Sequence, residues 1–529
     1  MERGYILSID QSTQGTKAIL LDGQGQFVLR RDLPHRQLIS AQGWVGHDAQ
    51  EIAENIIRVA QAAVRDSGID SRRLAGVAVT NQRESVALWE RDTGRPVCES
   101  IVWQCNRAAE LCRHIQERGD YPEIQRRTGL VPSSFFSAGK VAWALEHVPG
   151  AREKAERGQL CIGTMDTWTI WQLTGGKVHK TDCSNASRTQ LFNIHTMEWD
   201  PELCRIFDIP MSVLPQVCGS DGEYGQTDLG GLLDHPVPIR SAIGDSHASL
   251  FGHGCVERGD CMAGHGTGTC VLMNIGEEPL ESQNGLNTTV AWRMNGKTVY
   301  ALEGVVNYAG AVTTWLKDGL ELVSCPEETE ALACRADPGD HTYLVPAFTG
   351  IGAPYWDDGA SACFVGMSRL TGRAELVRAG IESIGYQVAD IVRAMERDMG
   401  APASQVRMAG GPTKNRYLTQ FQSDIMDRPV VLGKYEELVA VGAGQMAGLA
   451  MGLYDLPELE RLRRTQLFRP RMEQKERLER LDLDTFGVAL FAAAVISPLR
   501  RSGLLLSLLE RLFHTFDRFD GLALGIDGD

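Results

Sequence analysis

The chain has 529 residues, more than one hydrophobic core usually spans, so we expect two large domains with a ligand between them. Hydrophobic residues make up 43% and charged residues 23%, as in globular proteins, and the net charge is -15. This charge disfavours nucleic acid or an anionic membrane as the main partner. A phosphate ligand is not excluded, because backbone N–H groups and a metal can hold phosphates in an acidic protein.

The N-terminus and the cysteines indicate the compartment. The opening MERGYILSID runs straight into a strand pattern, so we expect no signal peptide. The 13 cysteines include no C-x-x-C pair and no cluster with histidines at zinc spacing. We therefore predict a cytoplasmic protein with reduced thiols and no zinc site.

The first half of the chain predicts strands and helices in alternation. Two apolar strands around a polar turn predict a hairpin over 5–22, with Asp10 where the first strand ends. An amphipathic helix follows over 49–68. The next predicted elements are a buried strand at 74–80, a strand at VALWE and a helical region at about 104–118.

The second half repeats part of this plan. A strand at 237–244 ends at Asp245, and 259–276 reads as strand, Gly/Thr turn, strand. The hairpin therefore recurs after about 255 residues, which suggests two domains on one plan facing each other across a ligand. A unit at 404–426 then gives a strand, paired glycines and a helix, and a small-residue helix follows at 436–453.

The tail after about residue 485 differs in character. Its apolar run FGVALFAAAVIS is too short to span a bilayer, and RRSGLLLSLLERLFHTF has helical spacing of apolar residues. We favour a packed, oligomer-forming or poorly ordered helix over docking on a membrane surface.

Three features fit phosphoryl transfer, which needs phosphate donors, a metal and a group that orients the attacking hydroxyl. The turns at 11–16 and 265–269 and the pair Gly410-Gly411 expose backbone N–H groups, although most such turns are only turns. Asp10 and Asp245 end apolar strands, where a carboxylate serves a metal or a general base, or simply caps a helix.

Other polar and aromatic residues suit a polyol. Arg83 and Glu84 follow a buried strand and can donate to and accept from hydroxyl groups; a surface ion pair is the alternative. Trp103 can stack on carbon–hydrogen faces or fill the core.

Long stretches resemble the FGGY carbohydrate kinases, and among them the members that phosphorylate glycerol. They include TNQRESVALWE, IVWQCNRAAELC, GTMDTWTIWQLTGGKVH, TDCSNASRTQLFNIHTMEWD and VPAFTGIGAPYWD, within a resemblance that runs from about residue 5 to 471. The resemblance implies an α/β fold of two ribonuclease H-like (actin-like ATPase) domains with ATP and substrate in the cleft between them. We expect an acceptor-binding domain at 1–250, a nucleotide-binding domain at 251–480 and a divergent tail at 481–529. It also implies a homo-oligomer.

The family pattern implies roles at matching positions. Asp245 would be the catalytic base, and Asp10 would help hold Mg²⁺. The implied acceptor contacts are Arg83, Glu84, Trp103, Phe135, Asp245 and Ser246. The implied contacts to ATP and its phosphates are Asp10, Thr13, Gln14, Gly15, Lys17, Thr267, Gly310, Thr314, Gly411 and Asn415.

The chain also departs from that pattern. Glycerol-phosphorylating members usually have Tyr at Phe135, Gln at Ser246 and Phe at Cys270, and the phosphate turns carry Ser12 for Gly and His265 for Tyr. The smaller side chains at 246 and 270 predict a larger acceptor pocket, so a tetritol, pentitol or ketose is the alternative acceptor to glycerol.

Two other classes fit less well. A non-catalytic ATP-binding switch would need neither Arg83-Glu84 nor Asp245. An oxidoreductase would need G-x-G-x-x-G after the first strand, which is absent.

Overall fold

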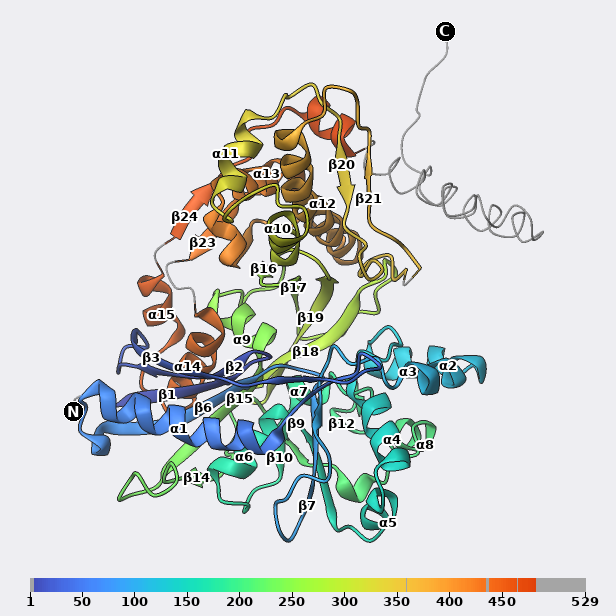
Figure 1. Ribbon diagram of the computed structural model, residues 1–529. Helices are drawn as coiled ribbons and strands as arrows, with labels where there is room; N and C mark the ends of the chain where they lie inside the picture. The colour runs from blue at the N-terminus through green and yellow to red at the C-terminus, as the bar shows by residue number, and fades with distance from the viewer. Residues whose placement is uncertain (1–3, 358, 434–436, 464, 482–529) are drawn as a thin grey trace.

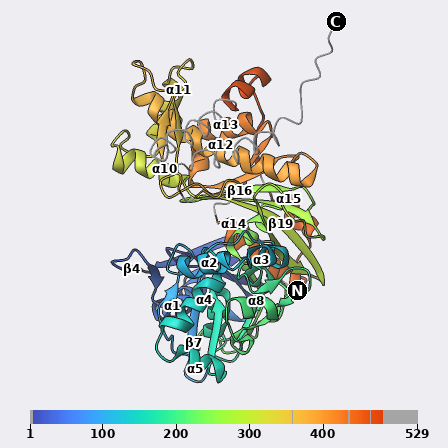
Figure 2. The ribbon, with the colours of Figure 1, turned by 90° about the vertical axis from the view of Figure 1, so that its right-hand side faces the viewer.

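The structure is a computed structural model that describes residues 4–357, 359–433, 437–463 and 465–481 (Figure 1). The predictions for the tail after about residue 485 lie outside these residues. The chain forms two α/β bodies, one above the other in both ribbon views (Figures 1 and 2). No helix of the described residues is long and apolar enough to cross a membrane.

The first body is built on a six-stranded sheet in the order β14-β15-β6-β1-β2-β3. The predicted hairpin is confirmed: β1 (Tyr5–Gln11) and β2 (Gly15–Leu21) pair antiparallel, and β6 (Leu74–Asn81) lies parallel on the other side of β1. The other strands are β3 (Phe27–Pro34), β14 (Gln226–Thr227) and β15 (Val237–Gly244). Helix α1 (Ala49–Ser67), also predicted, starts where the Asp48 side chain accepts the N–H groups of Gln50 and Glu51.

The second body is built on a seven-stranded sheet in the order β18-β19-β17-β16-β22-β23-β24. Its central hairpin is β16 (Cys261–His265) with β17 (Thr269–Gly276), and β22 (Val406–Gly410) lies parallel to β16. The remaining strands are β18 (Asn287–Met294), β19 (Lys297–Val306), β23 (Val430–Gly433) and β24 (Thr465–Phe468).

The two sheets share one plan. In each, a hairpin is flanked by an antiparallel strand on one side and by two parallel strands on the other: β3-β2-β1-β6-β15 matches β19-β17-β16-β22-β23. The repeat inferred from the sequence is therefore confirmed. Because the carboxyl ends of parallel strands meet at one edge of a sheet, the plan gathers the loops after β1, β6 and β15.

A smaller sheet, β4-β5-β8-β7-β9, extends the first body. Its strands are β4 (Gln37–Ile39), β5 (Val45–His47), β7 (Val86–Glu90), β8 (Ser100–Ile101) and β9 (Leu160–Thr164). Helices α2 (Ala109–Glu117) and α4 (Ser137–His147) pack beside it in one apolar cluster that includes Ile115, Val141 and Leu160. Helix α2 is shorter than the helical region predicted at about 104–118.

Helix α14 (Leu438–Ala450) joins the two bodies. It follows β23 in the chain but packs against β1, β6 and β15 of the first sheet and against α9 (Asp245–Gly252). Glycines permit this approach, since a Cβ on Gly442 would lie 2.0 Å from the Ala248 carbonyl oxygen. One apolar cluster, with Ile6, Phe251 and Val441 among its members, therefore crosses from one body to the other.

Candidate active site

The loops after β6 and β15 bring Arg83 and Asp245 together. The two strands are parallel neighbours with Asn81 opposite Gly244, so the residues that follow lie at the same sheet edge. Asp245 is the first residue of α9, and Arg83 Nε donates to its Oδ1 at 3.0 Å. Arg83 is 6% exposed, whereas the Asp245 side chain is 34% exposed, so the carboxylate remains accessible to a ligand.

A buried carboxylate of the second body completes this group. Glu303, on β19, is fully buried and accepts from Arg83 Nη1 at 2.6 Å. It also forms an ion pair with Arg188, whose Nε donates to Glu84 Oε1 at 2.6 Å. Burial opposes ionisation of Glu303, but the charges of Arg188 and Arg83 outweigh it and hold its pKa below the ordinary value.

Glu84 adopts a backbone conformation that favours glycine. Its φ is 61°, in the left-handed region, and Ser137 Oγ donates to its carbonyl at 3.1 Å. Burial raises the pKa of Glu84, while Arg83 and Arg188 act against that rise. A strained, fully buried carboxylate persists only when its surroundings hold it, and such residues concentrate at functional sites.

Aromatic rings form one wall beside these charges. The rings of Trp103 and Phe135 lie edge to face with centroids 5.7 Å apart. Trp103 Nε1 donates to Thr13 Oγ1 at 3.0 Å, which joins this wall to the turn after β1. Lys140 stabilises the loop that carries Phe135: its Nζ donates to the carbonyls of Ser134 and Phe136, each at 3.0 Å, and to that of Phe135. Burial lowers the pKa of Lys140 to about 8.

Two of the positions that depart from the family pattern lie directly on the charged group. Ser246 Oγ donates to Asp245 Oδ1 at 3.1 Å. The Cys270 thiol donates to Glu303 Oε1 at 3.2 Å, and its Sγ lies 3.8 Å from Arg83 Nη2. Both side chains therefore contact the charged group formed by Arg83, Asp245 and Glu303.

Asp10 is a second carboxylate close to this edge. It is 2% exposed, its Oδ2 lies 3.7 Å from Lys17 Nζ, and its buried Oδ1 has no partner among the described residues. Burial raises the pKa of Asp10 to about 6; Lys17 opposes the rise, and the charges of Asp245 and Glu437 add to it. Lys17 also donates to Glu437 Oε2 at 3.2 Å, directly before α14.

The turn between β1 and β2 carries Thr13, Gln14 and Gly15. Gly15 allows β3 to pass closely, because a Cβ there would lie 2.6 Å from the Leu33 carbonyl oxygen. Gln14 is exposed, and its carbonyl accepts from the His35 N–H at 3.3 Å. The hydroxyl of Thr13 points toward Trp103 and Gln82 rather than into solvent alone.

In the second body, the turn between β16 and β17 packs on α10 (Gly310–Thr314). The Thr267 carbonyl accepts from the N–H groups of Ala309 and Ala311, at 2.9 and 3.1 Å. Gly310 donates to the Gly266 carbonyl at 3.0 Å, and a Cβ on Gly310 would lie 2.6 Å from that oxygen. Thr314 is exposed one turn further along.

The sequence predicted that the paired glycines after β22 open an α-helix directly, and this prediction is wrong. Residues Gly411–Lys414 form a turn of 3₁₀ helix, and helix α13 (Arg416–Met426) begins after Asn415. The Asn415 side chain caps that helix by accepting from the Leu418 N–H at 2.9 Å, and it donates to Thr329 at 3.0 Å. Gly411 itself is exposed, with open space around it.

The structure thus gathers Arg83, Glu84, Trp103, Phe135, Asp245 and Ser246 in the first body, and Thr267, Gly310 and Thr314 around one turn of the second. Sequence reasoning missed Arg188 and Glu303. For Glu303 the available signal was a charged residue inside the apolar strand KTVYALEGVV, which implies a buried partner. Arg188 lies in the polar stretch CSNASRTQLF, which gives no such signal.

Two sheets of one plan, with charged strand ends between them, are the arrangement that the sequence resemblance implied for a two-domain small-molecule kinase. The N-terminal domain model of the FGGY family of carbohydrate kinases matches residues 5–252, and its C-terminal domain model matches residues 261–451. The chain therefore belongs to the FGGY family of carbohydrate kinases.

Its relatives include enzymes named glycerol kinase. Glycerol kinase 2 of Thermotoga maritima is 45% identical over 481 residues, which cover 90% of this chain and 96% of that one. The glycerol kinase of Deinococcus radiodurans is 45% identical over 478 residues, which cover 90% of this chain and 95% of that one.

Solved structures agree on the fold. The crystal structure of Plasmodium falciparum glycerol kinase with ADP is similar with a TM-score of 0.87 and 33% identity, covering 93% of this chain and 98% of that one. A xylulose kinase of Lactobacillus acidophilus, 23% identical, has a TM-score of 0.84 with 94% and 100% coverage, and supports the fold alone.

The buried charge of Glu303 generates a first prediction. Glu303→Gln removes the charge that Arg83 and Arg188 share and leaves each of these buried arginines with one carboxylate partner, Asp245 and Glu84. The free energy of unfolding should therefore fall by about 3 kcal/mol or more in chemical denaturation. The control is Glu277→Gln, which breaks an ion pair with Lys297 at 3.4 Å between side chains that are 61% and 72% exposed. That change should cost less than about 1 kcal/mol. Equal losses of unfolding free energy in the two variants would contradict the role of Glu303 as a buried counter-ion.

The raised pKa of Asp10 generates a second prediction. The folded chain binds this proton more tightly than the unfolded chain, so the associated stability is present below about pH 4 and is lost as the pH rises through about 6. Relative to Asp10→Asn, the wild-type chain should lose about 3 kcal/mol of unfolding free energy over that range. Denaturation of both chains in metal-free buffer from pH 4 to 7 measures it. A difference that does not vary with pH would contradict the burial of this carboxylate.

Proposed function

We propose that the chain is a kinase that transfers the γ-phosphate of ATP to a hydroxyl of glycerol or a related small polyol. The observation that carries this is the group of Arg83, Glu84 and Asp245 beside the Trp103–Phe135 wall. Charged donors and acceptors for hydroxyl groups stand there next to an apolar face for carbon–hydrogen groups. A polyol presents that same combination of surfaces.

In the proposed mechanism, Arg83 and Glu84 hold the acceptor hydroxyls. Arg188 and Glu303 fix both side chains, so little side-chain freedom is lost when the acceptor binds. Trp103 packs against the carbon chain of the acceptor, and its Nε1 bond to Thr13 keeps the ring oriented. Rigid support of this kind favours a reactive geometry over the many unproductive ones.

Asp245 is the proposed general base. Its Oδ1 already accepts three hydrogen bonds: from the N–H of Ser246 at 2.6 Å, from the Ser246 hydroxyl and from Arg83. No bond to Oδ2 is formed by the described residues, which leaves that oxygen to orient the attacking hydroxyl and accept its proton. Closure of the two bodies over the substrates would exclude water and limit wasteful hydrolysis of ATP.

The phosphates of ATP would lie at the turns after β1 and β16. In this proposal Thr13, Gln14, Gly15 and Lys17 approach them from the first body. The second-body contacts are Thr267, Gly310, Thr314, Gly411 and Asn415. Support comes from the exposed glycine turn at 266–268 packed on α10 and from the open space around Gly411. The Asn415 side chain caps α13, so in this proposal it acts by positioning the 3₁₀ turn that precedes the helix.

The residues also fit a magnesium ion. The Oδ1 of Asp10 is buried without a partner, and Mg²⁺ commonly takes one or two carboxylates together with water and substrate phosphates. The described residues hold no group of three or more His, Cys, Asp or Glu arranged for a metal. When bound, Mg²⁺ would neutralise charge on the phosphates, and Asp10 would hold it.

A larger acceptor is the second candidate. Cys270 and Ser246 are small side chains that contact Arg83 and Asp245. Room at this position would admit one or two more hydroxymethyl groups, as in a tetritol, a pentitol or a ketose. The two candidates share one mechanism and differ only in the acceptor.

We further propose the division into domains at 1–250 and 251–480 and a homo-oligomeric state, as the family resemblance implies. A cytoplasmic location is supported by the 13 cysteines, all of which are free thiols. Sedimentation of the purified chain tests the oligomeric state.

The base assignment generates a third prediction. Asp245→Asn removes the proton acceptor but keeps the shape of the side chain, so turnover should fall about 10²–10⁴-fold. ADP release in a coupled assay measures turnover, and calorimetry should show ATP binding within a few-fold of wild type. The control is Asp208→Asn, at a side chain that is 87% exposed. Near-normal turnover in Asp245→Asn would remove the assignment.

The acceptor pocket generates a fourth prediction. ADP release is measured with MgATP and glycerol, dihydroxyacetone, erythritol, pentitols or ketopentoses. Cys270→Phe fills the pocket, so activity with the longer acceptors should fall about 10–100-fold relative to activity with glycerol. An unchanged ratio would place Cys270 away from the acceptor. Silence across the whole panel with ATP still bound would favour the ATP-binding switch.

A further inference from the structure

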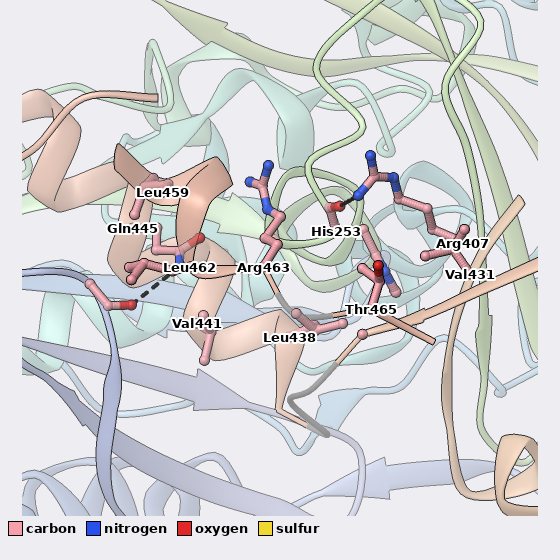
Figure 3. A pocket seen from close by; sticks show the side chains of 13 residues that line it. His253, Arg407, Val431, Leu438, Val441, Gln445, Leu459, Leu462, Arg463 and Thr465 are labelled. Atoms are coloured by element: carbon pink, nitrogen blue, oxygen red, sulfur yellow. Dashed lines mark hydrogen bonds between the residues drawn. The ribbon is translucent and has the colours of Figure 1, made fainter. Parts of the chain in front are cut away.

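A pocket is lined by residues of both bodies, none of which belongs to the candidate active site (Figure 3). Its lining comes from the ends of α9 and α14, from α15 (Leu456–Leu462) and from β22, β23 and β24. Both bodies therefore contribute to it. Its described lining contains two arginines and a histidine but no aspartate or glutamate.

The polar groups of this pocket are incompletely paired. Arg407 donates through Nη1 to the His253 carbonyl at 2.9 Å, yet its Nε is buried without an acceptor. It forms no ion pair with a carboxylate of the described residues, in contrast to most arginines near the core. Arg463 pairs with Glu460, but its Nη2 is also buried without an acceptor.

His253 lies between the two arginines in Figure 3 and is 4% exposed. Its Nε2 has no partner among the described residues. Burial, together with the positive charges of Arg407 and Arg463, lowers the pKa of His253 to about 3. The ring is therefore neutral at physiological pH and can present Nε2–H as a third donor.

The position of Arg463 depends on a glycine. A Cβ on Gly254 would lie 2.1 Å from Arg463 Nη1, so the guanidinium lies directly against the backbone after α9. A cation held in this way, at a chain segment of the first body, is built into the pocket rather than free in solvent.

Buried guanidinium nitrogens without an acceptor, such as Arg407 Nε and Arg463 Nη2, are costly, and an oxyanion supplies the acceptor that they lack. Donors from three side chains suit an anion with three or more oxygens better than a carboxylate with two. An acidic chain with a net charge of -15 would otherwise repel anions, and the described lining of this pocket holds two arginines and no carboxylate, although Glu460 pairs with Arg463 beside it.

We propose that this pocket binds a small phosphate-bearing anion through Arg407, Arg463 and His253 and that its occupancy regulates the kinase. The bound anion contacts strands of the second body and helices that pack on the first. It therefore favours one relative position of the two bodies over others. The start of α14 transmits this shift, because Glu437 precedes that helix and binds Lys17, which pairs with Asp10.

Isothermal titration of the full chain with inorganic phosphate, and separately with glycerol 3-phosphate, tests binding. Arg407→Met and Arg463→Met should each weaken the pocket's phosphate binding about tenfold or more. Thr465→Glu, which places a carboxylate on the lining without removing an arginine, should abolish it. The matched control is Arg461→Met, an exposed arginine on the same helix as Leu459 and Leu462, which should bind as wild type does.

Each outcome decides the matter. Phosphate binding that is lost in Thr465→Glu and kept in Arg461→Met supports the site. Tighter binding of one of the two titrants shows whether the ligand is free phosphate or a phosphorylated polyol. No uptake by the wild-type chain, or equal uptake by all four variants, overturns it.

The regulatory part rests on the proposed kinase activity, whereas the binding part does not. ADP release at subsaturating MgATP should respond at least twofold more to phosphate in the wild type than in Thr465→Glu. Competition of phosphate at the active site affects both chains equally and cancels in this comparison. Binding without that difference would overturn regulation while leaving the site, and an absence of ADP release in either chain would instead contradict the proposed function.

Discussion

The bond between Glu303 and two arginines is the constraint on which the candidate active site depends. Glu303 belongs to the second body, and Arg83 and Arg188 belong to the first. Their charges are fully desolvated, so each is stable only while the others are in place. This one carboxylate fixes the side chains that would hold the acceptor, and it ties them to the sheet that carries the proposed nucleotide contacts.

The repeated sheet plan explains why polar residues so distant in sequence come together. Parallel strands β1, β6 and β15 end at one edge, which brings Asp10, Arg83 and Asp245 to neighbouring positions. Similar strand order in the second body sets the 266–268 turn and Gly411 at the corresponding edge. In the proposed function, side chains such as Cys270 would decide the acceptor without changing the fold.

Much of the fold was predictable from the sequence. Apolar runs and turn residues located the hairpins, the strand before Asp245 and helix α1 closely, because these elements follow from local periodicity. The 3₁₀ turn at Gly411 was not predicted, since Pro412 and the Asn415 cap together delay the helix in a way that glycine spacing does not reveal. The pairing of Arg188 with Glu303 was not predicted because the two residues lie 115 positions apart in the chain and in different bodies of the fold. The roles of the individual site residues remain proposals.

The return of α14 to the first sheet has a consequence for synthesis of the chain. A ribosome releases the strands of the first body early, but the helix that covers one face of β1 and β6 emerges only after the second body has been made. Until residue 450 leaves the exit tunnel, Ile6, Ala78 and Ile243 lack their apolar cover. The first body therefore completes its folding last. Until then the nascent chain exposes an apolar sheet face that is prone to aggregation and is a binding surface for chaperones.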